Sequence, residues 1–307
     1  DIPAGLSRAS SSINVFHSRR PDAECTMTVA VLVPAHNESA VIARTLAPLE
    51  AWAASGRGRI VVIANACVDR TADQARNACP SATVIETPIG GKTHAMNLGE
   101  LALPEGPVLC LDADLIVEPS TLEALDRALR AGAAAACGRM QVNLTGTSPI
   151  TRLYYVGWRL NPYHDNGKFG GLFGVGAAAR TDLFPLPPVT ADDEYVKRLF
   201  IGQIAFVPEA VFTARAPRRL IDLVRVRRRS CRGTRALRNL STAGAKPIAL
   251  RTFAVMLARG AQNPSCMPGL IVFLLINALV RFQLLFEPAT AEQNWERDES
   301  SRISERC

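Results

Sequence analysis

Residues 28–39, TVAVLVPAHNES, decide the fold that this sequence predicts. The run from Thr28 to Val33 is apolar and largely β-branched up to Pro34, as in a strand whose two faces are both buried in a parallel sheet. A helix-like segment follows, and the same order of strand and helix then recurs. Further strands are expected at 59–66, 81–87 and 107–114, and helices at 35–52, 69–78 and 90–103. This alternation predicts an α/β fold, a mainly parallel sheet flanked by helices.

The composition is that of a folded protein large enough for one α/β domain and an appendage. Of the 307 residues, 48% are apolar and 21% are charged, which excludes a disordered chain. We expect a flexible leader over 1–26, the α/β domain over 27–235 and a helical C-terminal extension over 236–307. The leader lacks the long apolar run of an intact secretory signal, and the eight cysteines form no CxxC pair. Reduced cysteines and a cytoplasmic location are therefore expected.

Polar side chains gather where the predicted strands end, and in parallel α/β folds ligands bind beyond these carboxyl ends. Asp112 and Asp114 follow the strand-like run VLCL at 108–111. In an extended backbone their carboxylates lie on the same side, so both can face a hard cation such as Mg2+ or Mn2+. The alternative is a strand end that is polar only because it meets solvent.

Two further carboxylates, Asp192 and Asp193, stand between a proline-rich segment and the helix-like YVKRLF at 195–200. One of them is expected to cap this helix, because anions are favoured at a helix N-terminus, and the other is then free to act as a general base. Capping alone is the simpler interpretation. Lys92 stands at a glycine-flanked helix start, where it either meets phosphate or is a surface lysine after an ordinary turn.

Several other kinds of site are excluded by their spacing. The GGKTH segment at 90–94 lacks the upstream glycine of a phosphate-binding P-loop, because Glu86 occupies that position. The histidines do not have zinc-site spacing, and no GxSxG nucleophile elbow occurs. The glycines of 170–176 have no clear βαβ unit around them, which argues against a dinucleotide site. They indicate either a flexible backbone near an acceptor or tight loop packing.

The second half of the sequence is less regular. The glycine-rich 167–180 and the proline-rich 184–189 are expected to form loops that close over a site. Ten arginines crowd the stretch 215–238, which predicts a diphosphate or an anionic lipid as partner, with a solvated basic face as the alternative. Nucleic acid is not expected, because no aromatic platform accompanies the arginines. The apolar run 269–286 is either a membrane-embedded or interfacial helix at the inner face of the cell membrane, or a buried core or dimer helix.

Four motifs in this order resemble the inverting family 2 glycosyltransferases of GT-A fold: VAVLVPAHNES, IVVIANACVDRTADQA, GGKTHAMNLG and LDADLIVEP. The resemblance extends roughly from Thr28 to Gly233. It implies a nucleoside-diphosphate sugar as donor, for which we expect UDP, and a bound Mn2+ or Mg2+ ion. It also implies transfer of a sugar to an acceptor hydroxyl with inversion, and we expect a carbohydrate, a lipid or a lipid-linked sugar as the acceptor.

The resemblance assigns the contacts to the nucleotide. Pro34 and Glu38 would line the nucleoside pocket, Asn65 would approach the base, and Lys92 would lie near the base and the diphosphate. Ala64 and Asn65 stand where many relatives carry two acidic residues, so the sequence departs from the family's pattern at the position that contacts the nucleoside base.

The resemblance likewise assigns the metal and diphosphate contacts. Asp112 would lie near the ribose or the metal, and Asp114 would be the metal ligand proper. The stretch RVRRRSCRG at 225–233 is similar to the family's arginine motif, with Arg229 at the position that grips the diphosphate. Ser230 replaces the tryptophan of polymer-making members, which favours transfer of a single sugar.

The acceptor side is assigned in the same way. GLFGVGAAAR at 171–180 is similar to the family's acceptor loop, and ADDEYVKRL at 191–199 to the segment that holds the catalytic base. The spacing to Arg198 matches Asp192 to that base, with Asp193 as the rival. Two alternatives from other functional classes stay open at this point: a metal-dependent nucleotidyltransferase, and a non-catalytic membrane-peripheral binding protein of the same fold.

Overall fold

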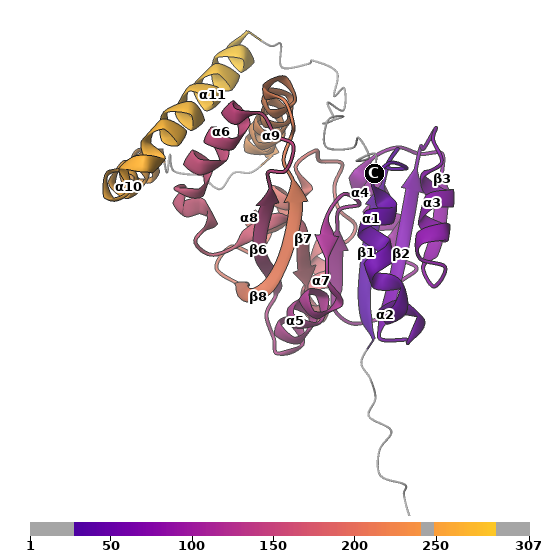
Figure 1. Cartoon of the computed structure of the whole chain (residues 1–307). Helices are drawn as coiled ribbons and strands as arrows, with labels where there is room; N and C mark the ends of the chain where they lie inside the picture. Colours follow the sequence, from indigo (N-terminus) through magenta and orange to yellow (C-terminus); the bar gives the residue numbers. More distant parts are fainter. Residues whose placement is uncertain (1–27, 241–248, 287–307) are drawn as a thin grey trace, which may run out of the picture.

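The computed structural model describes residues 28–240 and 249–286, which form one central sheet with helices on both faces and a helical layer at one side (Figure 1). The first half contains the predicted alternation of strands and helices. Its strands are β1 (Val29–Ala35), β2 (Gly58–Asn65), β3 (Thr83–Thr87) and β4 (Val108–Leu111), and its helices are α1 (Ile42–Leu46), α2 (Glu50–Ala54), α3 (Thr71–Ala78) and α4 (Lys92–Glu100). These four strands are all parallel to one another, as expected.

The second half completes an eight-stranded sheet in the order β3-β2-β1-β4-β7-β6-β8-β5. Its elements are β5 (Ile116–Val117), α5 (Pro119–Arg130), β6 (Ala135–Asn143), α6 (Pro149–Arg159), β7 (Lys168–Val175), α7 (Ala177–Leu183), α8 (Asp192–Leu199) and β8 (Ile204–Arg215). Strand β7 is antiparallel to both of its neighbours, β6 is parallel to β8, and β5 is antiparallel to β8. The fold class is therefore confirmed, with the parallel part of the sheet concentrated in its first half.

Strand β1 explains why the sheet is covered on both faces. All seven of its residues are buried. Val29, Val31 and Val33 face a core that also contains side chains of α1, α2 and α5, whereas Ala30 and Leu32 face a second core formed with α4, α7 and α8. Because successive side chains of a strand point to opposite faces, an unbroken apolar run requires helices on both sides. The apolar run TVAVLV therefore indicates a strand that is covered by helices on both faces.

The expectation of loops over residues 167–180 is wrong. This segment forms β7 and the start of α7, and β7 lies between β4 and β6 in the middle of the sheet. Glycine is used here for close packing: a Cβ atom at Gly174 would lie 2.6 Å from Leu129 Cδ1 and 2.7 Å from Leu109 Cδ2. The glycine-rich composition therefore reflects a lack of space around a central strand. The proline-rich 184–189 does lie outside helices and strands.

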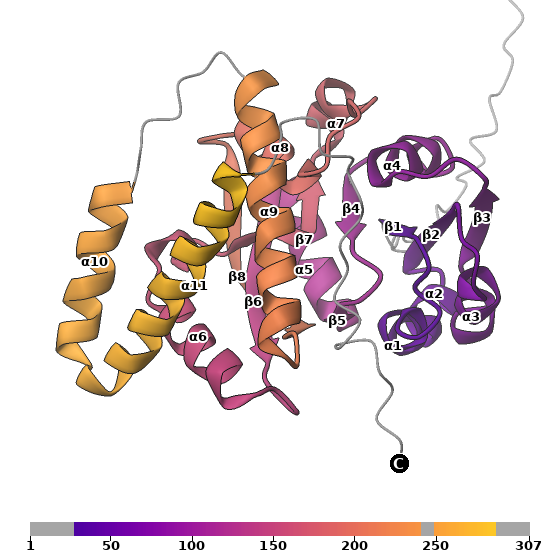
Figure 2. The same cartoon turned by 90° about the horizontal axis from the view of Figure 1, so that it is seen from above.

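The C-terminal helices pack on one flank of the sheet domain, on the opposite side of the molecule from β3 (Figure 2). They are α9 (Leu220–Leu240), α10 (Ala249–Gln262) and α11 (Met267–Leu285). Tyr154 of α6, Leu223 of α9 and Phe273 of α11 belong to a separate apolar cluster, so this layer has its own small core. The expected domain boundary after residue 235 falls inside α9. The expected leader and the last residues of the extension lie outside the described part of the chain.

Candidate active site

The carboxyl ends of β1 and β2 are followed by two loops that are hydrogen-bonded to each other. The Asn37 side chain accepts from Val68 N at 2.7 Å, and Asp69 Oδ2 accepts from Ser39 N at 3.1 Å. Asn37 and Ala66 both have left-handed backbone conformations, with φ of 49° and 45°. Such conformations are unfavourable for residues other than glycine and concentrate at functional sites, where the surrounding structure holds them in place. These hydrogen bonds therefore hold the two loops in a defined conformation at the carboxyl edge of the sheet.

Asn65, expected to approach a nucleoside base, joins three segments of this edge. It is 3% exposed, donates from Nδ2 to Ala35 O at 2.7 Å and accepts at Oδ1 from Gly91 N at 3.1 Å. The amide thus ties the ends of β1 and β2 to the turn that precedes α4. Of the other two expected nucleoside contacts, Pro34 is buried within β1, and Glu38 is half-buried in the loop that follows it.

Lys92 lies between two of the predicted carboxylates. Its Nζ atom is 2.8 Å from Asp112 Oδ1 and 2.8 Å from Asp192 Oδ2. The side chain is 19% exposed, and helix α4 begins at this residue, as predicted. Burial disfavours its charge, but the two carboxylates outweigh burial and hold the pKa of Lys92 well above its ordinary value. Lys92 therefore forms one charged centre with two aspartates that follow it by about 20 and 100 positions in the sequence.

Asp192 is the most deeply buried member of this centre. It is 3% exposed at the start of α8, and burial, with smaller contributions from Asp193 and Asp112, raises its pKa to about 6 against the opposing effect of Lys92. The predicted capping of α8 by one of the two aspartates is not observed: the N-cap residue is Ala191, without a side-chain cap. Asp193 instead accepts the neighbouring Glu194 amide at 2.8 Å.

Asp112 and Asp114 lie in a turn whose backbone is held from two sides. Asp112 N donates to Gly171 O of β7 at 2.7 Å, and Thr45 Oγ1 donates to Ala113 O at 2.8 Å. Ala113 is buried between two half-buried aspartates, as the predicted alternation requires. In residues 28–240 and 249–286, no three His, Cys, Asp or Glu side chains cluster as a metal cage. Two carboxylates suit a Mg2+-type ion that takes its remaining ligands from substrate phosphates and water.

Two glycines of β7 bring this strand close to the carboxylates. Gly170 and Gly171 have φ of 147° and 79°, in the region that side chains rarely adopt. A Cβ atom at Gly170 would lie 2.5 Å from Asp193 Oδ2, and one at Gly171 would lie 3.7 Å from Asp112 Oδ2. The segment that resembles an acceptor loop therefore does reach the predicted site, although as a strand.

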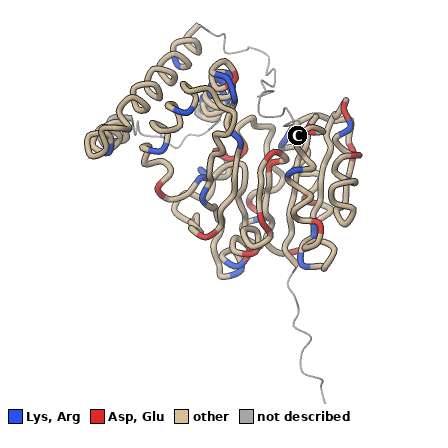
Figure 3. The backbone as a smooth tube through the Cα atoms, viewed as in Figure 1, with Lys and Arg blue, Asp and Glu red and all other residues tan. Residues whose placement is uncertain are grey.

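Helix α9 carries the predicted diphosphate-binding arginine towards the same place. A Cβ atom at Gly233 would lie 2.9 Å from the Cβ of Ala191, which directly precedes Asp192. Arg229 is four residues before Gly233 and therefore lies on the same face of α9. Arginines are dense along α9 and appear as blue segments in the charge-coloured trace (Figure 3).

Three residues that no sequence motif indicated, Tyr163, Lys168 and Lys197, lie near Asp193. Lys197 Nζ is 3.7 Å from the centroid of the Tyr163 ring, and Lys168 Nζ is 5.5 Å from it. Tyr163 and the two lysines come from three separate elements and form no linear motif. The only available signal was the unusual position of Lys168 at the start of the glycine-rich segment.

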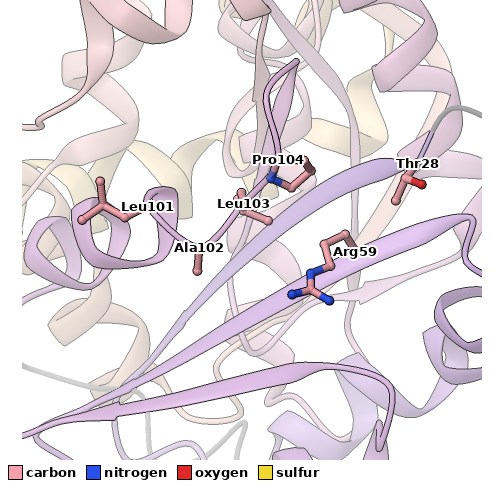
Figure 4. A pocket seen from close by; sticks show the side chains of 6 residues that line it. All are labelled: Thr28, Arg59, Leu101, Ala102, Leu103 and Pro104. Atoms are coloured by element: carbon pink, nitrogen blue, oxygen red, sulfur yellow. The ribbon is translucent and has the colours of Figure 1, made fainter.

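A separate surface hollow lies away from these residues (Figure 4). It is lined by Thr28, Arg59 and residues 101–104, at the amino ends of β1 and β2. Ligands of parallel α/β sheets bind at the opposite, carboxyl ends. We assign no function to this hollow.

The fold is that of a sugar-transferring enzyme of GT-A type. The chain belongs to the glycosyl transferase family 2: the model of that family, described as "Glycosyl transferase family 2", matches residues 30–184, about half of the chain. The expected family and enzyme class are thereby confirmed, and the nucleotidyltransferase and non-catalytic alternatives are not supported. Curated protein sequences contain no significant match.

Two solved structures show the same fold. A mannosyltransferase from Pyrobaculum calidifontis in complex with GDP-Man and Mn2+ is 20% identical with a TM-score of 0.52, and the match covers 83% of this chain and 78% of that one. Glucosyl-3-phosphoglycerate synthase from Mycobacterium tuberculosis, in complex with Mn2+, UDP-glucose and phosphoglyceric acid, is 20% identical with a TM-score of 0.51, covering 71% and 82%. At this identity the likeness is one of fold.

Replacement of Lys92 by Met should destabilise the protein in a pH-dependent way. The folded-state pKa of Asp192 is already above its ordinary value of 3.8, so ionised Asp192 costs stability above that pH, and loss of Lys92 raises the folded pKa further. The deficit should therefore grow as pH rises, reaching about 3 kcal/mol at pH 8 and clearly less at pH 5. Urea denaturation at both pH values measures it.

The double variant Lys92→Met/Asp192→Asn is the matched control. It removes the carboxylate that Lys92 balances, so most of the pH dependence should disappear. An equal loss of stability at pH 5 and pH 8 in Lys92→Met would contradict this account of the charged centre.

Proposed function

We propose that this protein transfers a single sugar from a UDP-linked donor to an acceptor hydroxyl with inversion, assisted by Mn2+ or Mg2+. The observation that carries the proposal is the Lys92 ammonium between Asp112 and Asp192 on the carboxyl edge of the sheet. It joins the residues expected at the donor to the residue expected to act as the base. The complexes of the two similar structures, with UDP-glucose or GDP-Man and Mn2+, support a nucleotide-sugar donor and a divalent ion.

The metal would be held by Asp114 and Asp112 together with the donor diphosphate. Bound there, it would supply a Lewis acid beside the leaving group. Arg229 would add positive charge near the same phosphates from α9, and Lys92 would hold the Asp112 carboxylate in position. Pro34, Glu38 and Asn65 would shape the nucleoside end of the cleft.

Asp192 is the better placed of the two candidate bases. A general base works best when its pKa lies near the operating pH, and burial brings the pKa of Asp192 to about 6. Its contact with Lys92 fixes its orientation relative to Asp112. Asp192 would take the proton of the acceptor hydroxyl as that oxygen attacks the anomeric carbon and the nucleoside diphosphate leaves.

We also propose that α11 contacts a membrane peripherally, which would suit a lipid or lipid-linked acceptor. The segment Pro264–Leu285 is the one helical stretch in the described residues that is apolar and long enough to span a bilayer, and 33% of its most apolar window is buried. Large apolar side chains are exposed along one side of this helix, namely Ile271, Leu275, Leu279, Phe282, Leu285 and Phe286. The opposite side packs against α6, where a Cβ at Gly157 would lie 2.3 Å from Gly269 O.

This packing favours a helix that lies on the membrane surface over one that crosses it. Spanning would expose the small core that α11 shares with α6 and α9. Residues 249–286 contain three arginines and no Asp or Glu, which suits an anionic leaflet. A cytoplasmic protein bound to the inner face of the cell membrane is the location that these features support.

UDP should bind in a metal-dependent manner. Calorimetric titration with UDP and Mn2+ should give a heat of binding that disappears without the metal and weakens at least tenfold in Asp114→Ala, because the ion loses a carboxylate ligand. Asp73→Ala, which removes an exposed carboxylate from α3, is the matched control and should bind as the wild type does. Binding of GDP instead of UDP would show that the donor contains guanine rather than uracil. Binding of neither nucleotide would refute the proposed nucleotide-sugar donor.

Asp192→Asn should lower the transfer rate by about 10²–10⁴ while UDP affinity stays near that of the wild type, since a base acts on the acceptor proton. Asp193→Asn, which removes the neighbouring carboxylate, is the control and should lower the transfer rate by less than about tenfold. The wild-type rate should fall as pH drops below about 6, where Asp192 becomes protonated. The reverse order of the two variants would transfer the role of base to Asp193.

Membrane contact predicts that the protein sediments with vesicles containing anionic phosphatidylglycerol. The double variant Leu275→Ser/Phe282→Ser should sediment at least tenfold less well, because each side chain would lose about 1.5–3 kcal/mol of apolar burial. Ile201→Ser removes an exposed apolar side chain elsewhere and should behave as the wild type does. A wild-type protein that stays in the supernatant would refute the contact.

A further inference from the structure

Strand β7 extends past the carboxyl end of β4, beyond the predicted metal site. Leu172 pairs with Leu111 at the end of β4, and Asp112 N bonds to Gly171 O, so residues 168–170 lie past the aspartates on the side of the sheet away from β1. The expected nucleoside contacts come from β1, β2 and α4, on the other side of β4. The region around Lys168 is therefore the acceptor half of the site in the proposed function.

Two lysines converge on one aromatic ring in this half. Tyr163 precedes β7, Lys168 begins it, and Lys197 is in α8, one helical turn after Asp193. The ammonium of Lys197 is 3.7 Å from the centre of the Tyr163 ring and that of Lys168 is 5.5 Å from it. The described residues contain three lysines, and this pair accounts for all but Lys92.

The positive charges of this pair are not matched by an ion pair. Within the described residues, no carboxylate oxygen lies within 4.0 Å of either ammonium. The two nearby carboxylates of α8 have other contacts: Glu194 pairs with Arg198 at 3.0 Å, and Asp193 accepts the Glu194 amide. Burial lowers the pKa of Lys197; Glu194 and, more weakly, Asp193 oppose this shift, whereas Lys168 adds to it.

Two neighbouring cations that are partly removed from water are unfavourable until an anion joins them. Ammonium groups and a phenol hydroxyl are donors, so they suit a ligand that offers several acceptor oxygens. Burial raises the pKa of Tyr163 and keeps its hydroxyl protonated as a donor. The position of Lys197 places such a ligand about one helical turn, roughly 5 Å, from the carboxylates at the start of α8.

We propose that Lys168, Lys197 and Tyr163 bind an anionic group, phosphate or carboxylate, that is part of the acceptor molecule. This inference rests on the proposed function, because that function makes this half the acceptor site. It narrows the acceptor to molecules in which the attacking hydroxyl and the anion are a few bonds apart. The lysine pair would then determine which hydroxyl-bearing compounds are accepted, while the Lys92 centre handles the donor.

The test uses the full-length protein with UDP and Mg2+ in excess, so that added anions cannot occupy the diphosphate site. Inorganic phosphate is titrated and followed by NMR chemical shifts, and acetate is titrated separately. The wild type should bind at least one of them in the millimolar range, and Lys168→Gln and Lys197→Gln should each weaken that binding roughly tenfold, since each removes a charged hydrogen-bond donor. The stronger of the two probes indicates whether the group is a phosphate or a carboxylate.

Arg59→Gln is the matched control, because it removes one exposed positive charge at the amino end of β2 and should leave anion affinity unchanged. Retention of UDP affinity in both lysine variants shows that they are folded. Equal anion affinity in the wild type and both lysine variants would overturn the inference. Failure of UDP to bind the wild type contradicts the proposed donor instead, and the same titration without nucleotide then still reports on the lysine pair.

Discussion

The contact of the Lys92 ammonium with Asp112 and Asp192 is the interaction on which the rest of the site depends. It connects the start of α4, the end of β4 and the start of α8, three elements that approach the edge of the sheet from different directions. Two carboxylates this close would repel each other without a cation between them, and the buried one would be protonated. This one charge therefore ties the start of α8, which also packs into the core through Val196, to the ends of β4 and α4.

In the proposed function, the distribution of charge along the edge separates the donor site from the acceptor site. Lys92, Asp112 and Asp192 carry one positive and two negative charges between them, so a diphosphate bound beside them in the proposed function needs a metal ion and the arginines of α9 to balance its own charge. The pair formed by Lys168 and Lys197 lies on the other side of β4 and has no ion-pair partner among the described residues. The charge of an anion that binds without a metal ion would be balanced by these two lysines. One edge of one sheet thus presents two environments for negatively charged ligands.

The glycines of β7 show why composition alone does not distinguish a loop from a central strand. A run rich in glycine is usually a loop, but Gly170 and Gly174 are glycines because a side chain would collide with Asp193 or with two core leucines. Nothing local in the sequence distinguishes glycine used for flexibility from glycine used for lack of space. The same limit applies to Asp192 and Asp193, because capping and catalysis require the same residue type at a helix start.

The sequence by itself determined the α/β fold, since an apolar run such as TVAVLV must be covered on both faces, and it determined which residues end the strands. It also singled out Asp112, Asp114, Lys92 and Asp192 separately as candidate site residues, because each stands at a strand end or helix start. Only the tertiary structure decided that Lys92 meets both aspartates, and that Tyr163, Lys168 and Lys197 form one cluster. These contacts join residues distant in sequence, and their strength depends on burial and distance, which no linear pattern encodes.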